Sequence, residues 1–135
     1  MSVIVDASMT IAWLFHDERA DMPRTVLRRV VAEGAVVPSI WRLEVANALR
    51  NAVRRKRCEA GYVTRSLQRL GRLPITIDPE TAAHAWGATR QLSIEHDLTL
   101  CDAAYLELAI RLKLPIATLD NDLRKAAEAE HAPLG

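Results

Sequence analysis

Short aliphatic runs alternate with longer segments of helical periodicity along the chain. The first run covers residues 2–5 and is rich in β-branched side chains, and residues 9–15 then follow as a helix. Three further runs of the same kind, each expected to be a strand, cover residues 35–37, 74–77 and 116–119. This alternation is typical of a parallel sheet that is covered by helices on both faces and connected by right-handed crossovers.

Capping and breaking residues set the expected helix ends. Ser39, Asp78 and Thr99 have side chains suited to N-caps, while Gly34 and Gly71 suit helix ends. The expected helices cover residues 9–15, 23–33, 40–57, 59–70, 79–92, 100–112 and 121–130, with a polar connection at 17–21. Because no repeat, low-complexity segment or linker interrupts this pattern, we expect residues 1–135 to form a single domain.

Composition fits a compact protein of this class. Of 135 residues, 50% are hydrophobic and 26% are charged, which is enough for a core that buries roughly two thirds of the unfolded surface. Cys58 and Cys101 are the only cysteines, too few for a disulfide framework and without zinc-ligand spacing. No uncharged stretch approaches the roughly 18 residues of a membrane span. We therefore expect a cytoplasmic protein without a membrane anchor.

Charge is distributed unevenly although the net charge is only +1. Residues 42–72 contain nine Lys or Arg against two Glu, a balance of +7, and the remainder of the chain therefore carries −6. A basic middle can attract a polyanion such as a nucleic acid, although charge runs are also common on solvated helix faces.

Four carboxylates are the candidate chemistry. Asp6 and Asp120 follow β-rich runs, and the carboxyl ends of parallel strands share one rim of a sheet. Asp102 and Glu44 lie on expected helices without an oppositely charged neighbour three or four positions away. Each alone could be a helix cap or a solvated charge. Together they form an oxygen-only ligand set of the kind that Mg²⁺ or Mn²⁺ requires, and such ions activate water for phosphodiester hydrolysis.

Four segments together resemble the PIN-domain nucleases, and among them the VapC toxins of bacterial toxin–antitoxin modules. The segments are VDAS at 5–8, PSIWRLEVANAL at 38–49, LTLCDAAY at 98–105 and ATLDNDL at 117–123. The resemblance implies an α/β/α domain with a central parallel sheet of four or five short strands and about seven helices. The short C-terminal tail, residues 132–135, leaves the fifth strand open.

The same resemblance implies a metal-dependent endoribonuclease that cleaves cellular RNA, is inhibited by a cognate VapB antitoxin and forms a homodimer. The four acidic active-site residues of this family match Asp6, Glu44, Asp102 and Asp120. Of these, Asp6, Asp102 and Asp120 would bind Mg²⁺, with Mn²⁺ as a substitute. Polar or acidic positions near the quartet match Ser8, Asn47, Thr118 and Asp122. Ser8 and Thr118 are expected to hydrogen-bond to the metal ligands.

An antitoxin helix is expected in a groove between residues 11–15 and residues 40–53, with Trp13, Phe15 and Trp41 as candidate groove residues. Core packing is the alternative role for all three. Two other functions stay open at this point: an aspartyl phosphatase or phosphoacceptor domain, and a catalytically silent domain that binds nucleic acid or a partner. The sequence contains no phosphate-binding glycine loop, nucleophile elbow or histidine pair with metal-ligand spacing.

Overall fold

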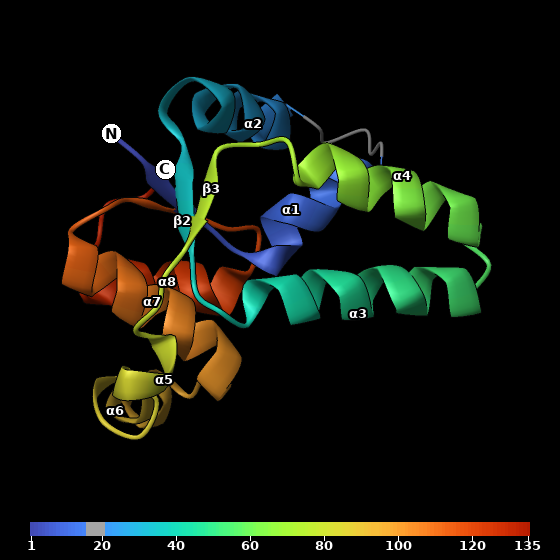
Figure 1. Cartoon of the computed structure of the whole chain (residues 1–135). Coiled ribbons are helices and arrows are strands. Elements are labelled where there is room, and N and C mark those ends of the chain that lie inside the picture. Colours follow the sequence, from blue (N-terminus) through green and yellow to red (C-terminus); the bar gives the residue numbers. More distant parts are fainter. Residues whose placement is uncertain (16–20) are drawn as a thin grey trace.

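The computed structural model describes residues 1–15 and 21–135 and contains a four-stranded parallel sheet surrounded by helices (Figure 1). The strands are β1 (Val3–Val5), β2 (Ala35–Val37), β3 (Ile75–Ile77) and β4 (Ile116–Ala117). The helices of the described residues are α1 (Ala7–Leu14), α2 (Asp21–Glu33), α3 (Trp41–Arg54), α4 (Ala60–Leu70), α5 (Thr81–His84), α6 (Ala88–His96), α7 (Leu100–Leu112) and α8 (Asn121–Ala129). The polar connection expected at 17–21 lies outside the described residues except for Asp21, which begins α2.

The sheet order is β3-β2-β1-β4, and every pairing is parallel. Passing from β1 through β2 to β3, the chain moves in one direction, and it then returns across the sheet to β4. With right-handed crossovers, this reversal puts α1–α4 on one face and α5–α7 on the other, as Figure 1 shows. The point of reversal lies between β1 and β4, and clefts for ligands form at such points beyond the carboxyl ends of the strands.

The core confirms that both faces of the sheet are covered. Consecutive strand residues point to opposite faces, yet Val3, Ile4 and Val5 are all 0% exposed. Helix α7 is buried over seven consecutive residues, 103–109, and it contacts both β1 and α6. A helix that is apolar on nearly all sides belongs inside a core, so α7 is a rigid support for any side chain at its N-terminus.

Several local predictions were wrong. Ser39 does not cap α3 with its side chain; its backbone N–H donates to Thr81 Oγ1 at 2.9 Å. No continuous helix covers residues 79–92, since the segment divides at residues 85–87 into α5 and α6. Asp78 is not the N-cap of α5, which is Glu80, and its carboxylate pairs with Arg111 at 2.6 Å. Helix α3 stops at Arg54, and β4 is two residues long.

The C-terminal tail is an extension of the sheet by one residue. Leu134 forms a single parallel bridge with Ile116 beyond β4. Two backbone hydrogen bonds hold it, from Ile116 N to Pro133 O at 2.9 Å and from Gly135 N to Ile116 O at 2.8 Å. The tail therefore lies against the sheet edge without forming a fifth strand.

Candidate active site

Asp6 lies at the carboxyl end of β1 and is 3% exposed. It is the N-cap of α1: its Oδ1 accepts hydrogen bonds from Met9 N at 3.0 Å and from Ser8 Oγ at 2.8 Å. Its Oδ2 accepts a hydrogen bond from the Thr118 hydroxyl. These three donors fix the orientation of a buried carboxylate at the centre of the sheet edge.

Thr118 and Ser8 join the end of β4 to the end of β1. Thr118 Oγ1 accepts a hydrogen bond from Asp120 N at 3.0 Å while donating to Asp6, and Ser8 Oγ accepts from Leu119 N at 3.1 Å. The expected hydrogen bonds of Ser8 and Thr118 to a site carboxylate are therefore confirmed. The loop after β4 is tied to β1, which brings Asp120 to the same rim as Asp6.

Asp120 is the N-cap of α8, and its Oδ1 accepts from Leu123 N at 2.9 Å. Asp122 is exposed in the first turn of the same helix. Asp102 is half-buried in the first turn of α7, which begins after the N-cap Thr99. Asp6 and Asp120 are therefore both N-caps, one of the roles considered for them. As N-caps, their carboxylates lie at the N-termini of α1 and α8, at this edge of the sheet.

Glu44 reaches the site from the first turn of α3, a helix that precedes α7 in the chain. Its Oε1 accepts a hydrogen bond of 2.6 Å from the hydroxyl of Tyr105, a core residue that is 1% exposed. Tyr105 is one helical turn after Asp102, so α7 supplies both an acidic group and the donor that holds Glu44. The sequence analysis did not predict a role for Tyr105. The feature that could have indicated one is a tyrosine one helical turn after an aspartate that has no charged partner.

The carboxylates are close enough to affect one another's ionisation. Burial raises the pKa of Asp6, Glu44 and Asp102, and the negative charge of neighbouring site carboxylates raises each of them further. For Asp102 the neighbours are Asp120, Asp6 and Asp122. Repulsion of this kind is offset when a divalent cation binds. The donor set contains only oxygen, which fits Mg²⁺ or Mn²⁺.

Spacing limits how the four carboxylates could hold an ion. In the described part of the chain, three ligand residues whose atoms all lie within 4.8 Å of one another occur at Glu95, His96 and Glu130 and not in the quartet. Mg²⁺ usually keeps several water ligands. The quartet therefore fits an ion held partly through water better than one enclosed by protein oxygens.

A basic arm extends from the site. Helices α3 and α4 contact each other and project from the sheet (Figure 1). All nine of their Lys and Arg side chains and those of their flanking loops are exposed: Arg42, Arg50, Arg54, Arg55, Lys56, Arg57, Arg65, Arg69 and Arg72. Glu44 is in the first turn of α3, so the positive surface begins beside the carboxylates. Asn47 is exposed on this helix, one turn after Glu44.

The expected groove beside α1 is present, but fewer aromatic side chains line it than predicted. A hollow of about 240 Å³ between α1 and α3 is lined by Ile11, Phe15, Ala48, Asn51, Ala52, Arg55 and Arg57. Trp41 is buried and donates to Thr10 Oγ1 at 3.0 Å, and Trp13 donates to Pro23 O at 3.0 Å. Trp13 and Trp41 are therefore packing residues, and of the three candidates only Phe15 lines the hollow.

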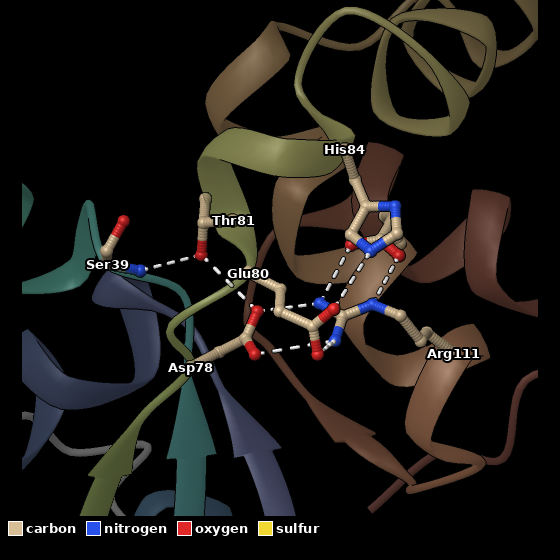
Figure 2. A network of polar contacts seen from close by, with 7 residues as sticks. Ser39, Asp78, Glu80, Thr81, His84 and Arg111 are labelled. Atoms are coloured by element: carbon tan, nitrogen blue, oxygen red, sulfur yellow. Dashed lines mark hydrogen bonds and ion pairs between the residues drawn. The ribbon is translucent and has the colours of Figure 1, made fainter.

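A separate polar network braces the sheet away from the carboxylates. The Arg111 guanidinium bridges Asp78 at 2.6 Å and Glu107 at 2.8 Å, with Glu80 at 3.6 Å (Figure 2). Arg111 holds the pKa of Asp78 below its usual value in spite of burial. This network joins the end of β3 to α7 and contains none of the four site residues.

The chain is similar to known proteins over nearly its whole length. The sequence model of a family described as PIN domain matches residues 3–129. Ribonuclease VapC9 of Mycobacterium tuberculosis is 30% identical over 128 residues, covering 95% of this chain and 93% of that protein. Among the described residues, no helix has the length and apolar character needed to cross a membrane.

Two solved structures have the same fold. PAE2754 from Pyrobaculum aerophilum superposes with a TM-score of 0.69 at 24% identity, covering 93% of this chain and 86% of that one. Mycobacterium tuberculosis VapC20, a sarcin-ricin loop cleaving toxin, superposes with a TM-score of 0.64 at 16% identity, covering 93% and 95%.

Proposed function

This chain belongs to the PIN domain family, and from that premise we propose that it is a metal-dependent endoribonuclease toxin with Asp6, Glu44, Asp102 and Asp120 as its catalytic carboxylates. One observation carries the proposal: four acidic groups from distant parts of the chain converge at the switch point of the sheet, and the pKa values of three are raised. A structural role in capping would not require such repulsion.

Asp6, Asp102 and Asp120 would bind Mg²⁺, or Mn²⁺ in its stead, directly or through water. The ion, when bound, would activate water and offset charge on the scissile phosphodiester. Ser8 and Thr118 fix the Asp6 carboxylate by hydrogen bonds. Glu44, held by Tyr105, would complete the acidic cluster or orient the attacking water.

RNA is the substrate that the relatives support. The similar VapC9 is named a ribonuclease, and VapC20 cleaves the sarcin-ricin loop. Because carboxylates repel phosphates, a substrate needs a positive surface close to the site. The exposed arginines of α3 and α4 would supply it, starting one or two turns from Glu44.

Regulation would come from a VapB-type antitoxin, and the protein itself would be a homodimer in the cytoplasm. The hollow between α1 and α3 would accept an apolar segment against Ile11 and Phe15. A cationic side chain of that segment, directed at the carboxylates, would pair with them in place of the metal. Both cysteines are unpaired, which suits a reducing compartment.

Cleavage by purified protein tests the nuclease assignment. Wild-type chain should cut a mixed-sequence RNA in Mg²⁺ and stop when EDTA is added. Asp6→Asn and Asp102→Asn should reduce the rate by several orders of magnitude while circular dichroism stays unchanged. The matched control is Asp21→Asn, at an exposed position in α2. Metal-dependent cleavage that survives both site substitutions would remove the assignment, and a wild type with no cleavage would favour a binding domain.

The toxin role has its own test. Expression of the chain should arrest bacterial growth, and Asp6→Asn or co-expression of the protein encoded beside it should restore growth. Harmless overexpression of folded wild-type chain in its native host lacking that neighbour would contradict the toxin role and leave the cleavage result intact.

A further inference from the structure

Three side chains outside the carboxylate quartet are of the types that bind metal ions and lie close together. Glu95 and His96 end α6, and Glu130 follows the last turn of α8. One ligand atom from each lies within 4.8 Å of the other two. The hollow that Glu95 and Glu130 line also includes Glu107, Ile110 and Arg111 of α7, and it includes none of the four site carboxylates. The two sets are therefore distinct.

A hollow lies beside Glu95 and Glu130. It has a volume of about 380 Å³ and is lined by His84, Ala88, Gln91, Leu92, Glu95, Glu107, Ile110, Arg111 and Glu130. Nε2 of His84 is buried and has no hydrogen-bond partner among the described residues. The side chain as a whole is 32% exposed, and Nε2 forms an ion pair with Glu80 Oε1 at 3.8 Å when His84 is protonated. Figure 2 shows this ring beside the Arg111 network.

Charge in the hollow is not balanced by its own cation. The Arg111 guanidinium is committed to Asp78 and Glu107, at 2.6 Å and 2.8 Å. Glu130 pairs with His96, which is charged only when protonated, and Glu95 has no ion pair within the described residues. A divalent cation would supply the missing positive charge.

We propose that Glu95, His96 and Glu130 bind a divalent transition-metal ion of the zinc class. An imidazole nitrogen with two carboxylate oxygens selects a borderline ion such as Zn²⁺ over Mg²⁺, which prefers oxygen alone. Three protein ligands and a water complete a tetrahedral shell. His96 Nε2 and Glu130 Oε1 are 2.7 Å apart, whereas ligand atoms on tetrahedral zinc are about 3.3 Å apart. These two atoms would therefore move apart by about 0.6 Å on binding, and the Glu95 oxygen, within 4.8 Å of both, would complete the set.

The competing explanation is a hydrogen-bonded pair that fastens α6 to α8. His96 and Glu130 alone would be sufficient for that role. Glu95 separates the two explanations because it is exposed and takes part in no hydrogen bond or ion pair of its side chain within the described residues. If the pair only fastens α6 to α8, Glu95 has no role. If the site binds a metal, Glu95 supplies one of the three protein ligands.

Metal titration of the full chain tests the site independently of nuclease activity. The protein carries Asp6→Asn and Asp102→Asn to weaken the quartet, and is freed of metal with EDTA and dialysed. Co²⁺ is followed by visible absorption and Zn²⁺ by displacement of Co²⁺. We expect one equivalent of Co²⁺ in a tetrahedral environment, displaced by Zn²⁺ and insensitive to excess Mg²⁺.

Substitutions in the same background decide the ligands. Glu95→Gln should weaken Co²⁺ binding at least about tenfold and leave the melting temperature without metal unchanged, and His96→Gln should abolish binding. Glu128→Gln, at an exposed position in α8, should bind as the parent does. No saturable Co²⁺ signal, or equal affinity of the Glu95→Gln variant and the parent, would overturn the proposal. If His96→Gln fails to fold, the Glu95→Gln result still decides.

Discussion

The hydroxyl of Tyr105 donates a 2.6 Å hydrogen bond to Oε1 of Glu44, joining α7 to α3 inside the candidate site. This bond lowers the pKa of Glu44, although burial and the charges of Asp102 and Asp6 raise it more. The tyrosine therefore shifts Glu44 towards its ionised form, in which it could act as an acceptor.

Tyr105→Phe should slow RNA cleavage about tenfold, the effect of losing one charged hydrogen bond of roughly 1.4 kcal/mol. Without the donor the pKa of Glu44 rises, so the acidic limb of the pH–rate profile should move to higher pH. Rates measured with Mg²⁺ from pH 5 to 9 check both effects. The control is Tyr62→Phe, whose hydroxyl donates to the Leu14 carbonyl outside the site. A lower rate with an unmoved pH limb would indicate a packing role alone.

Stability without metal should depend on pH in opposite ways for two aspartates. The pKa of Asp6 is raised, so its neutral form favours the fold, and that contribution is lost as pH rises through the raised value. The melting temperature of Asp6→Asn relative to wild type in EDTA should therefore become more positive as pH rises. The pKa of Asp78 is lowered, so the Asp78→Asn difference should become more negative as pH rises from about 3 to 5.

Millimolar-scale Mg²⁺ should raise the melting temperature of wild type more than that of Asp6→Asn, because only ions bound to the folded state add stability. Differential scanning fluorimetry at fixed ionic strength measures the shift. Equal shifts in both proteins would show that the ion binds elsewhere.

Arg111→Met should destabilise the fold by about 3 to 5 kcal/mol, since it leaves Asp78 and Glu107 buried without their cation. Urea unfolding gives the magnitude, and Arg90→Met, at an exposed position in α6, is the control. The protein that remains folded should keep its cleavage rate, because the network contains none of the site carboxylates.

Arg50→Ala and Arg54→Ala should each weaken binding of single-stranded RNA to the inactive Asp6→Asn protein. Each lost phosphate contact should reduce the slope of log affinity against log salt by about 0.7. Fluorescence anisotropy at several salt concentrations measures the slope. Arg28→Ala, exposed on α2, should leave it unchanged, and a similar loss for Arg28 would indicate only a general charge effect.

Strand ends and capping residues made most of the candidate site predictable. Asp6 and Asp120 follow apolar runs, and because parallel strands end at one rim of a sheet, the sequence alone predicts that they lie together. Ser8 and Thr118 were expected as hydrogen-bond partners, and both contact Asp6. Local chemistry was sufficient here because each group lies within a few residues of a strand end.

Features set by distant contacts were not predictable. Asp78 followed by Pro79 has the local pattern of a helix start, but Arg111, 33 positions later, takes the Asp78 carboxylate. The hydrogen bond from Tyr105 to Glu44 spans 61 positions. Such partners depend on how α7 lies across the sheet, which periodicity and propensity do not determine.

The hydrogen bond between Thr118 and Asp6 spans 112 positions, and β1 pairs with β4 at a similar separation. A ribosome adds about 5 to 20 residues per second, so about 6 to 22 s pass between the synthesis of Asp6 and that of Thr118. The carboxylates of the proposed site cannot converge during that interval. The proposed site therefore forms only after Asp120 has been synthesised, and an inhibitor made before that time would be present when the site first assembles.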